Sequence, residues 1–255
     1  MSAKLPQPPK FGDPARRRAV APAERHHPKW LVLAACMVVL IPQLPFGNYV
    51  MYPFMILTTW FHEMGHGLTG LLLGMKFDGL VLLASGSGYA ELRYPADVSP
   101  VAQALVSAGG PLGPALAGAA LILASQTRRM CRIALDVLAA VIVISCIIWV
   151  RSVVGWVVLP GIAALILFVA AKGTEEWQRF AVQFFGVHAA ISMFGQWRYL
   201  FSTGGTIGGY HQVSDTGAMA QSLLLPHWFW AGAIIASGAA IVGASIWQVV
   251  RRYRQ

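Results

Sequence analysis

The sequence predicts an all-α polytopic membrane protein, with about six to seven transmembrane or re-entrant helices and one short β-hairpin. Of its 255 residues, 56% are hydrophobic and only 11% are charged, and the mean hydropathy is +0.60. Soluble domains carry roughly 25% charged residues, so this composition excludes a soluble globular protein. The apolar residues also gather in runs of 17 to 25, which are long enough to cross a bilayer.

Seven apolar runs are the candidate membrane segments. They cover residues 30–46, 50–74, 101–125, 133–150, 153–171, 180–200 and 227–250. Residues 77–94 differ, because two short β-compatible runs flank the sequence Ser-Gly-Ser-Gly, which is typical of a hairpin. Residues 201–226 form a long polar, glycine-rich interval, and loops of that length are often functional.

Charge divides the chain into three parts. Residues 1–29 carry a net charge of +5 and six prolines, which predicts a disordered basic tail. Residues 30–250 form a single transmembrane domain with a net charge of only +1, and residues 251–255 form a basic tail of +3. Basic ends of this kind favour contact with anionic lipid headgroups, so a membrane bilayer is the expected partner and nucleic acid is not.

The positive-inside rule leaves one conflict. The basic loop with Arg128, Arg129 and Arg132 is separated from the C-terminal tail by four segments, so both fit on the cytoplasmic side. The N-terminal tail is separated from that loop by three segments, which would place it on the opposite side. Either one segment between residues 30 and 125 is re-entrant, or the rule fails here.

The sharpest motif is an HExxH sequence, formed by His62, Glu63 and His66 within an apolar run. On a helix, positions i and i+4 lie on one face, so both imidazoles can bind one zinc ion. Glu63 lies beside that face, where its carboxylate can act as general base toward a zinc-bound water. Ionisable groups inside an apolar segment are costly unless they face a cavity, a partner or a metal.

Three stretches resemble the site-2 protease family of membrane-embedded zinc metallopeptidases, particularly its short bacterial branch. Residues 62–74, HEMGHGLTGLLLG, look like the zinc helix, and residues 108–114, AGGPLGP, resemble the Gly-Pro segment that packs on it. Ser214-Asp215 resembles a Ser-Asp motif before the last helix of that branch. The resemblance implies helices around a zinc site within the membrane, and hydrolysis of peptide bonds.

The resemblance has one gap, which concerns the third zinc ligand. Better-studied members supply it from a Leu-Asp-Gly or Asn-Pro-Asp-Gly type motif, and neither occurs here. Asp215 is our choice because it matches the motif of the short branch, although Ser214 or Asp215 could instead cap the following helix. The other candidates are His211, His188, Asp136 and Asp97, of which His188 is more typical of a hydrogen-bonded core histidine.

Three further features have two interpretations each. Gly70 and Gly74, like the glycines between residues 109 and 118, are typical of close helix packing. Pro111 and Pro114 could instead interrupt their segment and open a cavity for water. Arg198 either marks a membrane interface or stabilises an oxyanion during catalysis.

The sequence therefore predicts a multi-pass zinc endopeptidase of a bacterial inner membrane, with Glu63 as the catalytic base and His62, His66 and Asp215 as metal ligands. Its substrates would be transmembrane or membrane-associated proteins, which would unwind and pair as a strand with residues 77–94. A catalytically silent zinc-binding scaffold or chaperone is the alternative. A zinc or proton transporter would be expected to carry ionisable groups on several helices, or an inverted repeat.

Overall fold

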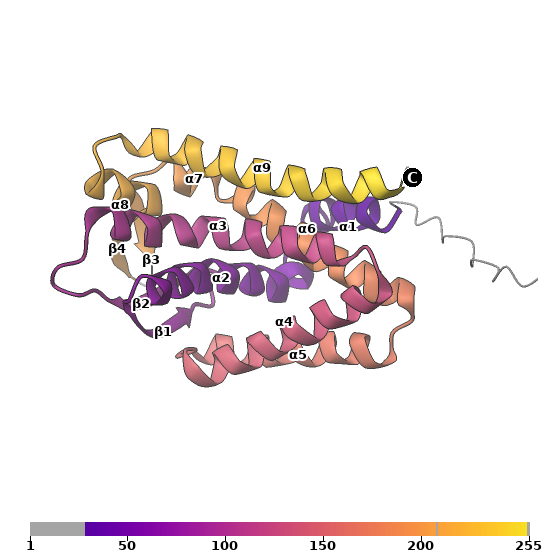
Figure 1. Ribbon diagram of the computed structural model, residues 1–255. Helices are drawn as coiled ribbons and strands as arrows, with labels where there is room; N and C mark the ends of the chain where they lie inside the picture. The colour runs from indigo at the N-terminus through magenta and orange to yellow at the C-terminus, as the bar shows by residue number, and fades with distance from the viewer. Residues whose placement is uncertain (1–28, 208, 254–255) are drawn as a thin grey trace, which may run out of the picture.

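The computed structural model describes residues 29–253 except residue 208, and its fold is the predicted all-α polytopic membrane protein (Figure 1). Its helices are α1 (Lys29–Leu40), α2 (Gly47–Leu72), α3 (Pro100–Ala124), α4 (Arg128–Ile148), α5 (Val153–Lys172), α6 (Glu175–Gly195), α7 (Trp197–Leu200), α8 (Asp215–Ser222) and α9 (His227–Tyr253). Two antiparallel hairpins pair β1 (Lys76–Leu82) with β2 (Gly88–Arg93), and β3 (Gly204–Ile207) with β4 (Tyr210–Val213). The predicted N-terminal tail lies outside the described residues, apart from Lys29.

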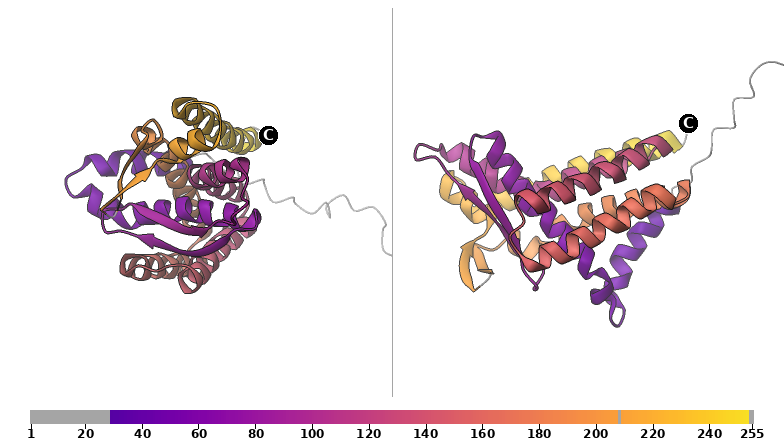
Figure 2. Two further views of the ribbon diagram at one scale, coloured as in Figure 1. Left: turned by 90° about the vertical axis from the view of Figure 1, so that its left-hand side faces the viewer. Right: turned by 90° about the horizontal axis from the view of Figure 1, so that it is seen from below.

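Four helices in the described part of the chain are long and apolar enough to cross a membrane: α3, α4, α5 and α9 as far as Arg252. The chain is therefore a multi-pass integral membrane protein. Helices α2 and α6 are of similar length but carry polar residues. Figures 1 and 2 show α3 packed between α2 and α9, with the α4–α5 pair beyond α2.

The first predicted segment is shorter than the sequence indicated. Residues 30–46 were expected to form one segment, but α1 ends at Leu40 and a 3-10 turn, η2 (Ile41–Gln43), follows. Pro42 has no N–H to continue the helix, and Phe46 adopts a left-handed conformation with φ of 63°. At 1.5 Å per residue α1 is roughly 18 Å long, which is too short to cross a bilayer alone.

Glycines allow α3 to lie directly against α2. A Cβ atom on Gly65 would lie 2.2 Å from the carbonyl oxygen of Gly109, and one on Gly113 would lie 2.6 Å from that of Phe61. No side chain fits at either position, so the backbones touch as small residues allow in membrane helices. The packing interpretation is therefore correct for Gly109 and Gly113. It is wrong for Gly74, which follows the end of α2 with φ of 82° and has no atom within 4 Å of an added Cβ.

The alternative interpretation, in which Pro111 and Pro114 interrupt their segment, is wrong. Pro111 and Pro114 are both buried inside α3, which continues without a break from Pro100 to Ala124. Each proline removes one helical hydrogen bond, and neighbouring helices commonly compensate for that loss in membrane proteins.

The predicted hairpin over residues 77–94 is confirmed as β1–β2, and it packs along α2. Gly67 and Gly70 on α2 leave room for the side chains of Phe77 and Leu92. Its turn reaches back along the helix, where the Tyr52 hydroxyl donates to the Ala84 carbonyl at 3.1 Å. The first strand is buried against the protein rather than exposed to lipid, since Phe77, Leu80 and Leu82 are each less than 9% exposed.

The outer edge of β1 is closed by the turn between α4 and α5. The Leu80 N–H donates to the Trp149 carbonyl at 2.8 Å, and the Arg151 N–H donates to the Leu80 carbonyl at 2.9 Å. One helical turn before Trp149, Ser145 on α4 accepts a hydrogen bond from the Trp60 indole of α2 at 2.9 Å. The hairpin is therefore held between α2 and the α4–α5 turn.

Candidate metal centre

Three side chains from two distant segments converge at the C-terminal half of α2. Nε2 of His62 lies 3.1 Å from Oδ2 of Asp215, and Nε2 of His66 lies 3.2 Å from Oδ1 of the same carboxylate. The two Nε2 atoms are 3.2 Å apart. All three residues are largely buried, and they form the one group in the described residues able to hold a metal ion.

A hydrogen bond to the backbone fixes the orientation of the His66 imidazole. Its Nδ1 lies 2.8 Å from the Val106 carbonyl oxygen of α3, which can only accept, so Nδ1 carries the proton. Nε2 is then the ring nitrogen left for a metal, and it lies 3.2 Å from both Nε2 of His62 and Oδ1 of Asp215. A carbonyl partner of this kind fixes the orientation of metal-binding histidines.

These distances fit a tetrahedral zinc ion. With ligands about 2.0–2.1 Å from the metal, tetrahedral donor atoms lie about 3.3 Å apart. The donor set of two imidazoles and one carboxylate is one that zinc accepts in catalytic sites. Among the described residues, Oδ2 of Asp215 and Nδ1 of His62 have no hydrogen-bond partner, so the carboxylate oxygen is available as a ligand.

At the start of α8, Ser214 rather than Asp215 caps the helix. The cap is Ser214, whose hydroxyl accepts from the Gly217 N–H at 3.1 Å and donates to the Ser202 carbonyl at 2.5 Å. The Thr216 hydroxyl also donates to the Leu200 carbonyl at 2.5 Å. Because Ser214 caps the helix, the Asp215 carboxylate is left free to face the histidines.

Gly110 on α3 lies directly against the centre. A Cβ atom at this position would lie 2.1 Å from Nε2 of His66. The Gly-Pro segment that the sequence analysis picked out thus forms the wall behind one ligand, and no larger residue fits there without moving the imidazole.

Glu63 is 5% exposed and lies next to the two histidines on α2. Its carboxylate faces the backbone of Ala90 on β2. The carboxylate is therefore positioned by the hairpin as well as by its own helix.

Two tyrosines beside the centre were missed by the sequence analysis. Burial, followed by the negative charges of Asp215 and Glu63, raises the pKa of the Tyr199 phenol on α7. Tyr94 follows β2, and partial burial together with the negative charge of Asp215 raises the pKa of its phenol. No sequence motif includes Tyr94 or Tyr199, so only the fold could show that they lie near the centre.

The other candidate ligands lie elsewhere. His211 is exposed on β4, and Asp97 is exposed in the loop before α3. His188 is half-buried and stacks on Phe184 with ring centroids 6.0 Å apart. Neither of its ring nitrogens has a hydrogen-bond partner among the described residues, so the expected hydrogen bonding of this histidine is wrong. Asp136 is half-exposed and lies 3.8 Å from Arg132.

Arg198 does not join the centre. Its side chain is exposed, while that of the neighbouring Tyr199 is half-buried. The interface interpretation therefore fits Arg198 better than the oxyanion role.

A bundle of membrane helices that encloses a His-His-Asp group, with a glutamate beside it, defines a membrane protein with a candidate metallohydrolase centre. The chain matches the family described as Peptidase M50B-like over residues 30–245, and it belongs to that family. The resemblance to the site-2 protease type is thereby confirmed. No curated protein and no solved structure matches the chain.

Proposed function

We propose that this protein is a zinc endopeptidase that hydrolyses peptide bonds of membrane or membrane-associated proteins, in a bacterial inner membrane. One observation carries the proposal: His62, His66 and Asp215 present three donor atoms at the spacing of a zinc site, with Glu63 beside them. Membership of a peptidase family supports this interpretation over other zinc functions.

Each residue of the centre would have a distinct role in hydrolysis. The three ligands would hold zinc, which as a Lewis acid supplies activation of water and polarisation of the scissile carbonyl. Glu63 would accept the proton of the attacking water and pass it to the leaving amine. The phenol of Tyr199, or that of Tyr94, would donate a hydrogen bond to the carbonyl oxygen as it becomes negatively charged.

The substrate would bind as an extended strand along β2. The N–H and C=O of Leu80 are directed at the α4–α5 turn, and Leu80 is the register partner of Ala90. Residues opposite each other in an antiparallel pair either exchange hydrogen bonds or both face outward, so Ala90 directs its own groups away from β1. That outer edge carries no further strand in the described part of the chain.

The same edge faces the candidate base, because the backbone of Ala90 lies against the Glu63 carboxylate. A helical substrate has no free backbone groups, so it must unwind before cleavage, and strand addition would satisfy the groups that unwinding releases. A strand added here would bring its peptide bond beside Glu63 and the metal ligands.

Metal analysis followed by a cleavage assay tests the proposal. The purified protein is expected to contain one zinc per chain, which His66→Ala and Asp215→Ala lose and Glu63→Gln retains. In liposomes, wild type should cleave members of a panel of single-span transmembrane peptides, as detected by mass spectrometry, and all three variants should not. Absence of zinc from folded wild type would overturn the proposal.

The silent-scaffold alternative predicts a different pattern. Zinc would still be bound and lost in the ligand variants, but wild type and Glu63→Gln would behave alike on every peptide. The retained glutamate and its position between the two histidines and the backbone of Ala90 favour the enzyme, because a scaffold does not need a base at the metal centre.

A further inference from the structure

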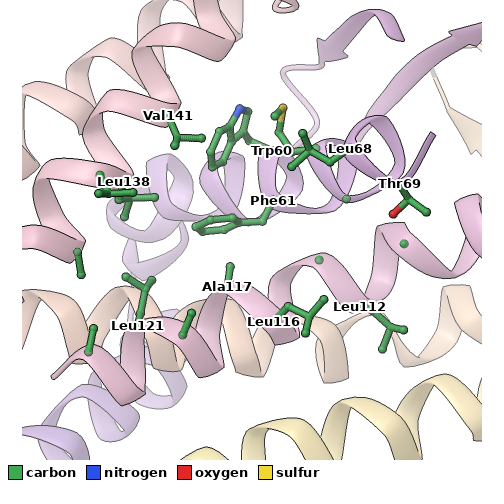
Figure 3. A pocket seen from close by; sticks show the side chains of 18 of the residues that line it. Trp60, Phe61, Leu68, Thr69, Leu112, Leu116, Ala117, Leu121, Leu138 and Val141 are labelled. Carbon is green, nitrogen blue, oxygen red and sulfur yellow. The ribbon is translucent and has the colours of Figure 1, made fainter. Parts of the chain in front are cut away.

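An apolar groove of about 760 Å³ lies between α2, α3 and α4. Helices α3 and α4 meet at the turn over residues 125–127 and diverge from it (Figure 1). Figure 3 shows the walls: Trp60, Phe61 and Leu68 on α2, Leu112, Leu116 and Leu121 on α3, and Leu138 and Val141 on α4. Thr69 is the only hydroxyl-bearing residue in a lining of apolar side chains and glycines. Since α3 and α4 are both membrane spans, the groove opens to the hydrocarbon of the bilayer.

The groove is separate from the metal centre. Its lining includes Gly65 and Gly109, whose backbones touch and close the wall between α2 and α3. None of the candidate ligands lines it, and neither does Glu63. An occupant of the groove would therefore not be the substrate of the metal centre.

Basic residues gather where the groove narrows. A second cavity, of about 600 Å³, is lined by Arg128, Arg129, Arg132, Asp136 and Gln178, and Ile133 lines both cavities. Three arginines against one aspartate leave its lining with a net positive charge. The ion pairs of these arginines are long and exposed: Arg128 lies 4.0 Å from Glu175, and Arg132 lies 3.8 Å from Asp136. Such pairs contribute little, so the guanidinium groups remain available to another anion.

Two further observations at this end favour an anion. Arg129 has no ion pair within the described residues. The first turn of α4 contains Arg128 and Arg129 and no acidic residue, although the positive end of the helix dipole favours the opposite charge there. The two arginines are therefore repelled by the positive end of the α4 dipole, and a bound anion would reduce that repulsion.

We propose that the groove and the basic cavity together bind one anionic phospholipid, with its acyl chains along α3 and α4 and its phosphate on the three arginines. The charge at the end of the groove favours lipid over a partner helix. Three arginines next to an apolar groove match a molecule with an anionic headgroup and acyl chains, whereas an apolar helix offers no charge to pair with them. Acyl chains are narrower than a helix and can follow the space between the diverging helices α3 and α4. The bound lipid would brace the α4–α5 pair against α2 and α3.

Native mass spectrometry of the full-length protein tests this proposal, with phosphatidylglycerol and phosphatidylcholine of identical acyl chains as probes. Wild type should retain one phosphatidylglycerol and bind it in preference to phosphatidylcholine. The double variant Arg129→Gln/Arg132→Gln should bind phosphatidylglycerol about 30-fold more weakly. The matched control Arg251→Gln/Arg252→Gln removes the same charge elsewhere and should bind as wild type does.

A second pair of variants tests the groove itself. Ala120 is exposed and lines the groove, so Ala120→Phe should fill it and weaken binding of both lipids at least tenfold. Ala140→Phe, at an exposed position of α4 outside the lining, should have no effect. Equal binding of the two lipids by wild type, or equal loss in both arginine variants, would overturn the proposal. So would a cysteine at position 120 that cross-links in cells to the helix of another protein.

Discussion

At the scale of single residues, the metal centre depends on the absence of a side chain at Gly110. A methyl group there would lie 2.1 Å from Nε2 of His66, and the flexible imidazole would turn away from it. We expect Gly110→Ala to fold and yet to bind zinc about 10- to 100-fold more weakly, because one ligand is displaced. Competition against a chelator of known affinity measures the change.

The control for this variant is Gly243→Ala on α9. Gly243 has no atom within 4 Å of the position of an added Cβ, so its replacement should leave zinc affinity unchanged. If both variants bind zinc as wild type does, the contact between α3 and His66 is not what places the imidazole.

Ser214 supports its neighbour in a comparable way. Removing its hydroxyl in Ser214→Ala breaks the cap of α8 and the bond to Ser202, which should cost about 1 kcal/mol and loosen Asp215. We expect zinc affinity to fall about tenfold. The control is Ser99→Ala, which removes the equivalent cap of α3. That cap is exposed, and none of its residues is a candidate ligand. The zinc affinity of Ser99→Ala should not change, and an equal fall in both variants would contradict the local role of Ser214.

The sequence reveals some of these residues and not others, for a physical reason. His62, Glu63 and His66 are local in sequence, and helical periodicity alone places them on adjoining faces. Asp215 is 149 residues beyond His66, so no periodicity relates the two, and the family resemblance had to suggest it. Tyr199 reaches the centre only because α7 and α8 fold back together, which no local pattern records.

At the scale of elements, the predicted helices correspond to those of the structure, and the errors fall where tertiary contacts decide. The run over residues 30–46 is apolar throughout, so hydropathy could not show that α1 stops at Leu40. The polar interval 201–226 contains the β3–β4 hairpin and α8, which composition did not reveal. The β1–β2 hairpin was predictable because its turn residues and flanking β-compatible runs are contiguous.

The strand β2 provides a test of substrate binding. Ala90→Pro removes the N–H on the outer edge of β2 without touching the hydrogen bonds to β1, which edge strands tolerate. We expect its zinc content to match wild type while kcat/KM for a cleaved transmembrane peptide falls at least tenfold through a higher KM. A fall confined to kcat would instead reflect the lost contact between the Ala90 N–H and Glu63. Ala90→Ser keeps the N–H and should cleave normally. Wild-type cleavage by Ala90→Pro would exclude strand addition at this edge.

At the scale of the whole molecule, the structure removes the conflict over topology. Lys29 at the start of α1 lies 3.4 Å from Glu176, and Arg128 at the start of α4 lies 4.0 Å from Glu175, so both sit at the same end of α6. The short α1 and α2 together pass once from this end to the hairpin end, and α3 returns (Figures 1 and 2). The beginning of the described chain and the basic loop therefore share one side, as the positive-inside rule requires.

The distribution of basic residues then predicts which side the centre faces. The end of the molecule that contains the α3–α4 turn is also where α1, α4 and α6 begin and where α5 and α9 end (Figure 1). Among the described residues, those element ends carry Lys29, Arg128, Arg129, Arg132, Lys172, Arg179, Arg251 and Arg252. The opposite end, with β1, β2, α7 and the α4–α5 turn, carries Lys76, Arg93, Arg151 and Arg198. By the positive-inside rule the first end is cytoplasmic, so the metal centre, which lies toward the hairpin end, opens to the opposite side.

Cysteine labelling in intact cells measures this orientation. In a background with Cys36, Cys131 and Cys146 replaced by serine, Asp97→Cys at the hairpin end should react with a membrane-impermeant maleimide added outside. Lys172→Cys at the basic end should react only after permeabilisation. Both positions are exposed in the structure, so a lack of reaction reflects the membrane and not burial. The reverse labelling pattern would place the centre on the cytoplasmic side and show that the basic residues do not set the topology of this chain.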